Sequence, residues 1–238
     1  MRAQRTLPPS AAPIEWRDLA QGLVGLVQPH VTMHRLEAEF RAHFGVKHVW
    51  FVSSGKAALT LILRALHRLS GRRQVVVPGY TCFSVPSAVI RAGLSVRLCD
   101  INPKTFDYDF VRLAEVADSE VLCVLATHLL GIGVDVPRVA EICHPKGIFV
   151  VEDVAQAFGG ERGGKFLGSM GHVSFLSFGR GKNITCGSGG AILTNDDRIG
   201  EALAQECAQL PAESLAGRLK NWVEVAATQF LINPSRYW

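Results

Sequence analysis

The chain has 238 residues, of which 48% are hydrophobic and 19% charged, with 25 basic and 21 acidic side chains. This much apolar material suffices for a large buried core and excludes intrinsic disorder. The formal net charge is +4, and the basic residues are mixed along the chain without a block that would bind phosphate backbones. We therefore expect no nucleic-acid partner.

The compartment is predicted from the cysteines and the apolar runs. Six cysteines lie mostly in apolar runs and form no C-x-x-C pair, as is typical of a reducing compartment. The most apolar window, residues 121–134, is too short to cross a bilayer. We therefore expect a cytoplasmic protein without a membrane span.

The first predicted element is an arm over residues 1–44 that carries one amphipathic helix at residues 33–43. From residue 45, apolar runs rich in β-branched residues alternate with helix-like segments, which is typical of an α/β protein. Strands are expected at residues 46–52, 74–77, 94–100, 121–125, 148–151, 173–177 and 190–194. Helices are expected at residues 56–69, 81–91, 136–143 and 196–207.

These elements predict a three-layer αβα domain over residues 45–200, built on a mainly parallel seven-stranded sheet with helices on both faces. Residues 201–238 are predicted to be helical segments that lead away from this domain. Within them, the apolar stretch 223–232 has the composition of a surface that packs against another part of a protein.

Polar residues follow the predicted strands, at the edge where open α/β sheets bind their ligands. The turn before Lys56 points the positive end of a helix at one spot and suits a phosphate, although Ser54 as a simple helix cap is an equal alternative. Asp153 ends a buried strand and needs a cation nearby, unless backbone amides satisfy it. Lys182, in a glycine-rich loop, is either a nucleophile towards carbonyls or a solvated surface lysine.

Other motifs carry less weight. Residues 159–165 match the letters of a phosphate-binding loop, but Phe166 stands where the magnesium-binding Ser or Thr belongs. His30 and His34 have helical spacing but no third ligand, so no metal site is expected. The first strand is not followed by the glycine pattern of a dinucleotide-binding fold.

Together, a phosphate cradle, a buried acid and a reactive lysine are what pyridoxal phosphate requires. The segments V-S-S-G-K-A-A-L, V-V-E-D-V-A-Q-A-F-G, S-F-G-R-G-K-N and G-S-G-G-A-I-L-T-N-D occur in this order. This combination resembles the DegT/DnrJ/StrS-type sugar aminotransferases, which are fold-type-I pyridoxal phosphate enzymes. The resemblance covers residues 45–197.

The resemblance implies a role for each matching residue on the ring side of the cofactor. Lys182 would form the Schiff base with pyridoxal 5'-phosphate and later move the proton. Asp153 would pair with the pyridine nitrogen, and Gln156 would contact the phenolic oxygen. The aromatic residue that commonly stacks on the ring falls at Cys82, so stacking would come from Phe83 or Tyr80 or be replaced by a weaker contact.

The resemblance also implies the phosphate and substrate contacts. Ser177 and the backbone of Ser54, Gly55 and Lys56 would hold the phosphate. His128, the polar member of the T-H-L-L-G segment, would contact the substrate.

The implied reaction is a ping-pong transamination in nucleotide-sugar or polysaccharide biosynthesis. Glutamate would load the cofactor with an amine, and a keto sugar or similar carbonyl compound would accept it. The family also implies a homodimer. Lys56, Cys82 and Leu130 depart from the family pattern and predict a divergent branch, which leaves the acceptor open.

Relatives of this kind continue into a small C-terminal domain, so the length at Trp238 predicts a truncated member. The alternative is a catalytically inactive large-domain remnant, which binds cofactor weakly or serves only as a partner subunit.

Overall fold

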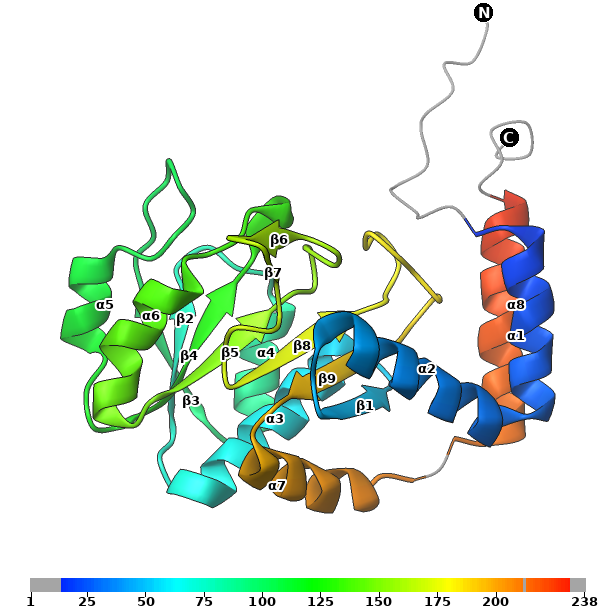
Figure 1. The fold of residues 1–238 in the computed structure, drawn as a ribbon, viewed down its shortest axis with the longest axis horizontal. Coiled ribbons are helices and arrows are strands. Elements are labelled where there is room, and N and C mark those ends of the chain that lie inside the picture. Colours follow the sequence, from blue (N-terminus) through cyan, green and yellow to red (C-terminus); the bar gives the residue numbers. More distant parts are fainter. Residues whose placement is uncertain (1–13, 212, 232–238) are drawn as a thin grey trace, which may run out of the picture.

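The computed structural model describes residues 14–211 and 213–231. Seven strands form one sheet in the order β1-β9-β8-β5-β4-β2-β3 (Figure 1). Their bounds are β1 (His48–Val52), β2 (Gln74–Pro78), β3 (Ser95–Cys99), β4 (Val121–Thr127), β5 (Phe149–Asp153), β8 (Val173–Ser177) and β9 (Gly190–Thr194). The predicted mainly parallel seven-stranded sheet is confirmed.

Strand direction decides where ligands can gather. β9 runs antiparallel to both of its neighbours, and the remaining pairs are parallel. The other six strands therefore point the same way, and their carboxyl ends meet at one edge of the sheet. In the register of this edge, Thr127 of β4 lies beside Asp153 of β5, and Ser177 of β8 lies beside Gly190 of β9.

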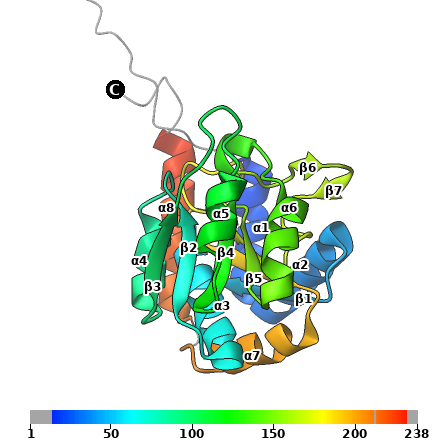
Figure 2. The ribbon, with the colours of Figure 1, turned by 90° about the vertical axis from the view of Figure 1, so that its left-hand side faces the viewer.

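Helices cover both faces, as the α/β pattern predicts (Figure 2). One face carries α3 (Gly55–Ser70), α4 (Ser84–Arg91) and α7 (Asp197–Ala208), which share one buried cluster with the sheet. The other carries α2 (Pro29–Phe44), α5 (Phe110–Val116) and α6 (Val136–Cys143). The chain also has short 3-10 turns η1 (Leu129–Gly131) and η2 (His144–Lys146), and a hairpin of β6 (Glu161–Arg162) and β7 (Lys165–Phe166).

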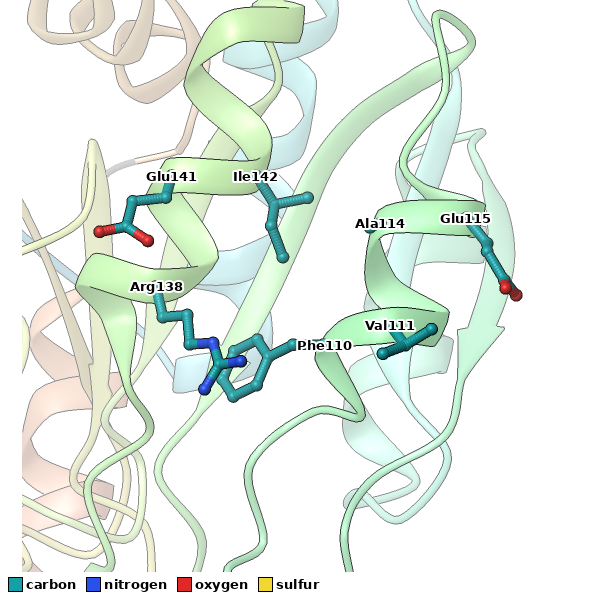
Figure 3. Close-up of a pocket in the computed structure, with 7 residues that line it drawn as sticks. All are labelled: Phe110, Val111, Ala114, Glu115, Arg138, Glu141 and Ile142. Atoms are coloured by element: carbon teal, nitrogen blue, oxygen red, sulfur yellow. The ribbon is translucent and has the colours of Figure 1, made fainter.

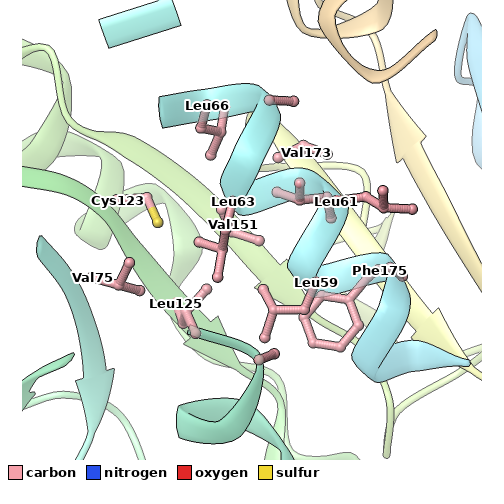
Figure 4. Close-up of a cluster of buried hydrophobic side chains, with 14 of the residues drawn as sticks. Leu59, Leu61, Leu63, Leu66, Val75, Cys123, Leu125, Val151, Val173 and Phe175 are labelled. Carbon is pink, nitrogen blue, oxygen red and sulfur yellow. The ribbon is translucent and has the colours of Figure 1, made fainter. Parts of the chain in front are cut away.

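The largest part of the core lies between α3 and the sheet (Figure 4). Apolar residues recur along α3 at helical spacing, so one side of the helix packs on β4, β8 and β9. Ser54 caps the start of this helix, and Gly71, in the left-handed conformation with φ 75°, ends it. Burial of α3 thus fixes where its N-terminus meets the sheet edge.

A pair of helices, α1 (Trp16–Val27) and α8 (Leu215–Leu231), stands beside this core (Figure 1). The indole N–H of Trp222 donates to the carbonyl of Leu19 over 2.9 Å, and Gly22 leaves room for that ring. The predicted apolar stretch at residues 223–232 belongs to α8 and partly packs on α1, although Ile232 lies outside the described residues.

The structure adds elements that the sequence pattern did not indicate. These are α1, the seven-residue α5 and the β6–β7 hairpin. The hairpin turns through Gly163 and Gly164, which both have positive φ, so residues 159–165 lead into and form a two-residue hairpin turn, and no helix follows them. Helix α7 starts before residue 200, the predicted end of the large domain, and packs on α3. Residues 1–13 of the predicted N-terminal arm lie outside the described residues. The limits of the domains therefore stay predictions.

Membrane helices and metal clusters are both absent from the described residues. Among the described helices, none is long and apolar enough to cross a membrane. Within the same residues, no group of three or more His, Cys, Asp or Glu side chains is arranged to hold a metal ion.

Because α3 fixes the position of the sheet edge, its buried side should dominate stability. Leu63→Ala removes a side chain with 0% exposure and should lower the free energy of unfolding by about 3 kcal/mol. Leu69→Ala, on the same helix but 42% exposed, should change it by no more than about 0.5 kcal/mol. Urea unfolding of both variants measures the difference, and equal losses would contradict this picture of the core.

Candidate functional site

The residues singled out from the sequence come together at the carboxyl edge of the sheet. Ser54, Gly55 and Lys56 follow β1, and Cys82 and Phe83 follow β2. His128 follows β4, Asp153 ends β5 and Gln156 lies just beyond it, while Ser177 ends β8 and begins the loop that carries Lys182. Segments up to 128 residues apart in the chain, from Ser54 to Lys182, therefore border one site.

The start of α3 and the end of β8 form a narrow cradle. A Cβ on Gly55 would lie 2.7 Å from the Cβ of Ser177, so only glycine allows this approach. A Cβ on Gly190 would come equally close to the backbone of Ser54, which is bridged to the neighbouring strand at Gly189. The N–H groups of the first helical turn have no acceptor within the helix, so this cradle suits an anion.

Ser54 both caps the helix and lines this cradle. Its hydroxyl accepts a hydrogen bond from the N–H of Ala57 over 3.1 Å, which is the simple capping role that the sequence left open. Gly55 and Lys56 are the first two residues of the helix, so their N–H groups belong to this turn, and the Lys56 side chain is exposed.

Asp153 is the buried acid of the site. Its side chain is 5% exposed, and its Oδ1 accepts one hydrogen bond from the N–H of Ala155 over 3.0 Å. Burial raises the pKa of Asp153 above its ordinary value, while the hydrogen bond from Ala155 and the nearby Lys182 act in the opposite direction. The carboxylate thus gains from any cation that enters beside it.

Lys182 lies in the loop between β8 and β9, residues 178–189, which internal backbone hydrogen bonds close. Phe178 and Gly189 close the base of the loop with a backbone hydrogen bond of 2.9 Å, and the Lys182 N–H donates to the carbonyl of Gly179 over 3.3 Å. The lysine is half-buried, and its charge acts on both Asp153 and Cys82. The loop thus carries Lys182 at the same edge of the sheet as Asp153.

Gln156 has a defined orientation. Its Oε1 accepts a hydrogen bond from the N–H of Leu130 over 3.2 Å, which leaves its amide NH₂ group to donate to a ligand. Leu130 supplies this N–H from the left-handed region, with φ 53° and ψ 27°, a conformation that a non-glycine residue adopts at a cost.

The segment after β2 offers a thiol and an open aromatic ring. The Cys82 Sγ lies 3.1 Å from the donating hydroxyl of Ser84, and this hydrogen bond is the main reason why the pKa of Cys82 is lowered. Phe83 is 84% exposed and Tyr80 63%, so neither ring is packed into the protein as the structure stands.

His128 lies beneath the site. Its side chain is fully buried, its Nδ1 accepts from the N–H of Val134 over 3.0 Å, and its Nε2 lies 3.0 Å from an oxygen of Glu152. The first contact places the proton of the neutral ring on Nε2, facing the carboxylate. The predicted substrate contact would require the ring to leave both bonds, so in this arrangement His128 supports the site from below.

Glu152 is the partner that sequence reasoning did not single out. Its fully buried carboxylate accepts backbone N–H bonds from Gly168, Met170 and Gly171 over 2.8, 2.7 and 2.5 Å, in addition to the His128 contact. It therefore joins the ends of β4 and β5 to the segment that enters β8. An acid that falls inside an apolar strand was the one available signal in the sequence.

Replacing this carboxylate by an amide should damage the fold, because an NH₂ group would face N–H donors. Glu152→Gln should lower the free energy of unfolding by about 3 kcal/mol. The exposed Glu141→Gln, also a loss of one negative charge, should have an effect within about 0.5 kcal/mol. Chemical denaturation measures both, and a Glu152→Gln protein as stable as the parent would show that these contacts contribute little.

A shallow pocket elsewhere is separate from this site. It lies between α5 and α6, where the Arg138 guanidinium sits 4.2 Å from the centre of the Phe110 ring (Figure 3). None of the residues that the sequence singled out lines it.

Comparison with known proteins shows which family and fold the chain shares. A GDP-perosamine synthase from Vibrio cholerae is 28% identical over 82% of this chain and 52% of its own length. Another, from Caulobacter vibrioides, is 34% identical over 68% of this chain and 44% of its own. The chain spans about half the length of the curated relatives it matches.

Solved structures have the same fold. A 3-amino-5-hydroxybenzoic acid synthase matches with a TM-score of 0.77 and 27% identity, over 88% of this chain and 56% of that one. The sugar aminotransferase CalS13 from Micromonospora echinospora matches with a TM-score of 0.75 and 26% identity, over 83% and 56%. A family model matches residues 25–230, and the chain therefore belongs to the DegT/DnrJ/EryC1/StrS aminotransferase family.

Proposed function

We propose that this chain carries the pyridoxal phosphate site of an aminotransferase that transfers an amino group to a keto sugar or similar carbonyl compound. The observation that carries the proposal is that a buried carboxylate, Asp153 at the end of β5, and a half-buried lysine, Lys182 in the loop after β8, lie at the same edge of the sheet. Membership of the aminotransferase family supports the same assignment.

The residues present fit the phosphate end of this cofactor. The cradle between Gly55 and Ser177 is too close for any other residue at position 55, and it presents unpaired N–H groups of a helix start. Lys56 adds a positive charge at its mouth. In this assignment the two backbone N–H groups and the Ser177 hydroxyl orient the phosphate, and Lys56 screens its charge.

The ring end fits as well. Bound pyridoxal phosphate supplies an electron sink when its ring nitrogen is protonated. Asp153 would hold that proton in place, because an ionised carboxylate in a buried site favours a cation beside it. Gln156 has its NH₂ group free to donate to the phenolic oxygen, and Lys182 would move the proton at the reacting carbon.

Few side chains are in place to stack on the face of the cofactor's pyridine ring. Cys82 replaces the stacking aromatic residue, and Phe83 stands 84% exposed. A thiol contributes less contact area than an aromatic ring, so we expect cofactor binding to depend mainly on the phosphate cradle and on the Asp153 contact.

The substrates, partners and compartment belong to the proposal too. We propose glutamate as the amino donor, a nucleotide-linked keto sugar as the acceptor, a homodimer as the assembly and the cytoplasm as the compartment. Three relatives are named GDP-perosamine synthase, which supports a sugar acceptor, whereas another is named 3-amino-5-hydroxybenzoate synthase, which leaves a carbonyl compound other than a sugar open.

A second candidate is a large-domain remnant that binds cofactor without turning it over. The exposed Phe83 and the thiol at position 82 favour it, because both weaken the hold on the ring. The two candidates differ in whether the bound cofactor reacts with an amino donor.

The first test concerns Lys182. Protein mixed with pyridoxal phosphate should develop the near-ultraviolet to blue absorbance of a cofactor attached to a lysine amine, and Lys182→Ala should lack it. Lys165→Ala removes an exposed lysine of β7 and should keep the full band. Absence of the band in the parent protein would exclude the proposed site.

The second test separates enzyme from remnant. Glutamate added to the loaded protein should shift the absorbance to that of the amine form and release one 2-oxoglutarate per chain, as a ping-pong half-reaction requires. Lys182→Ala serves as the negative control. A parent protein that keeps its band unchanged in glutamate would favour the remnant.

A further inference from the structure

Among the described residues, the hydroxyl of Thr127 is one of the few buried polar groups without a hydrogen-bond partner; Thr81 Oγ1 and Arg218 Nε are others. Thr127 ends β4, it is 5% exposed, and its Oγ1 is buried without any hydrogen bond. Buried hydroxyls in folded proteins are nearly always bonded, and an exception calls for a reason such as an absent ligand.

Thr127 lies directly beside Asp153. The two residues are register partners in the parallel pair β4–β5, and partners in such a pair point to the same face. Side chains two residues apart along a strand point to the same face. Leu125, two residues before Thr127, and Val151, two residues before Asp153, both pack in the buried cluster beneath α3. Thr127 and Asp153 therefore face the α3 side of the sheet edge.

Two alternatives do not explain the hydroxyl. A threonine at a strand end often bonds to a nearby backbone group, as Thr194 does with the carbonyl of His172 over 2.6 Å, but Thr127 has no such bond. A valine would fill the same volume without a polar atom, so packing alone does not call for threonine.

We propose that Thr127 is a positioning residue of the cofactor site, whose hydroxyl donates a hydrogen bond to the Asp153 carboxylate when that carboxylate holds the ring nitrogen. The hydroxyl keeps one oxygen of Asp153 fixed while the other faces the ring. This inference rests on the proposed function, because it needs the ring beside Asp153.

The test uses a near-isosteric pair of variants. Thr127→Val removes the hydroxyl, and Thr127→Ser keeps it while removing the methyl group. Thr127→Val should weaken pyridoxal phosphate binding about 10-fold, which is typical for a hydrogen bond to a charged group. Thr127→Ser should restore the affinity to within about 3-fold of the parent.

Stability gives the readout that a merely structural role would not produce. In cofactor-free protein, Thr127→Val should keep or raise the melting temperature, by up to about 3 °C, because it removes an unpaired buried hydroxyl. The matched control Thr194→Val should lower the melting temperature and leave cofactor affinity unchanged, since Thr194 lies at the opposite edge of the sheet. The pH titration of the bound cofactor's absorbance should shift in Thr127→Val alone.

Three results would overturn the proposal. Unchanged affinity and an unchanged titration in Thr127→Val would show that the hydroxyl does not act on Asp153. A loss of affinity in both Thr127→Val and Thr127→Ser, matched by a loss of stability, would assign Thr127 to packing. Failure of the parent protein to bind pyridoxal phosphate would reject the proposed function itself, and that result is distinct from the other two.

Discussion

The organisation of the site depends on the cost of burying the Asp153 carboxylate. An ionised acid that is 5% exposed and holds one backbone hydrogen bond is stable only with positive charge nearby. Lys182 supplies part of that charge, and a protonated ring nitrogen would supply the rest. The need for positive charge beside the Asp153 carboxylate therefore accounts for the lysine in the loop after β8 and for a protonated ring nitrogen in the proposed cofactor.

Glu152 and Asp153 show how neighbouring acids come to differ. Successive residues of a strand point to opposite faces, so Glu152 faces the α6 side while Asp153 faces the α3 side. Glu152 meets three backbone N–H groups and the His128 ring, which satisfy its oxygens. Because its oxygens already accept these hydrogen bonds, Glu152 has a structural role. Asp153 accepts a single backbone hydrogen bond, so its carboxylate remains available to a ligand.

The sheet, which the structure confirms, and the site residues Asp153 and Lys182, which stay predictions, both leave local signals in the sequence. Buried parallel strands are continuous apolar runs, and Asp153 and Lys182 lie in segments whose wording resembles a known family. The unpaired state of Thr127 and the burial of His128 leave no such signal, because each depends on partners distant in sequence or absent. Phe83 was expected only as a substitute for the aromatic residue that Cys82 replaces, and its 84% exposure results from the path of the chain after β2.

Helix α8, which lies outside the sheet, contacts a loop of the candidate site. Glu224 of α8 pairs with Arg180 over 3.2 Å, and Val225 lies against Gly187, where a Cβ would come within 2.7 Å of it. Both contacts fall on the loop that carries Lys182. The exposed ion pair contributes little by itself, but the close approach at Gly187 restricts where that loop can lie. Since α8 is fastened to α1 through Trp222, the position of the lysine depends on the packing of two helices that contribute no residue to the site.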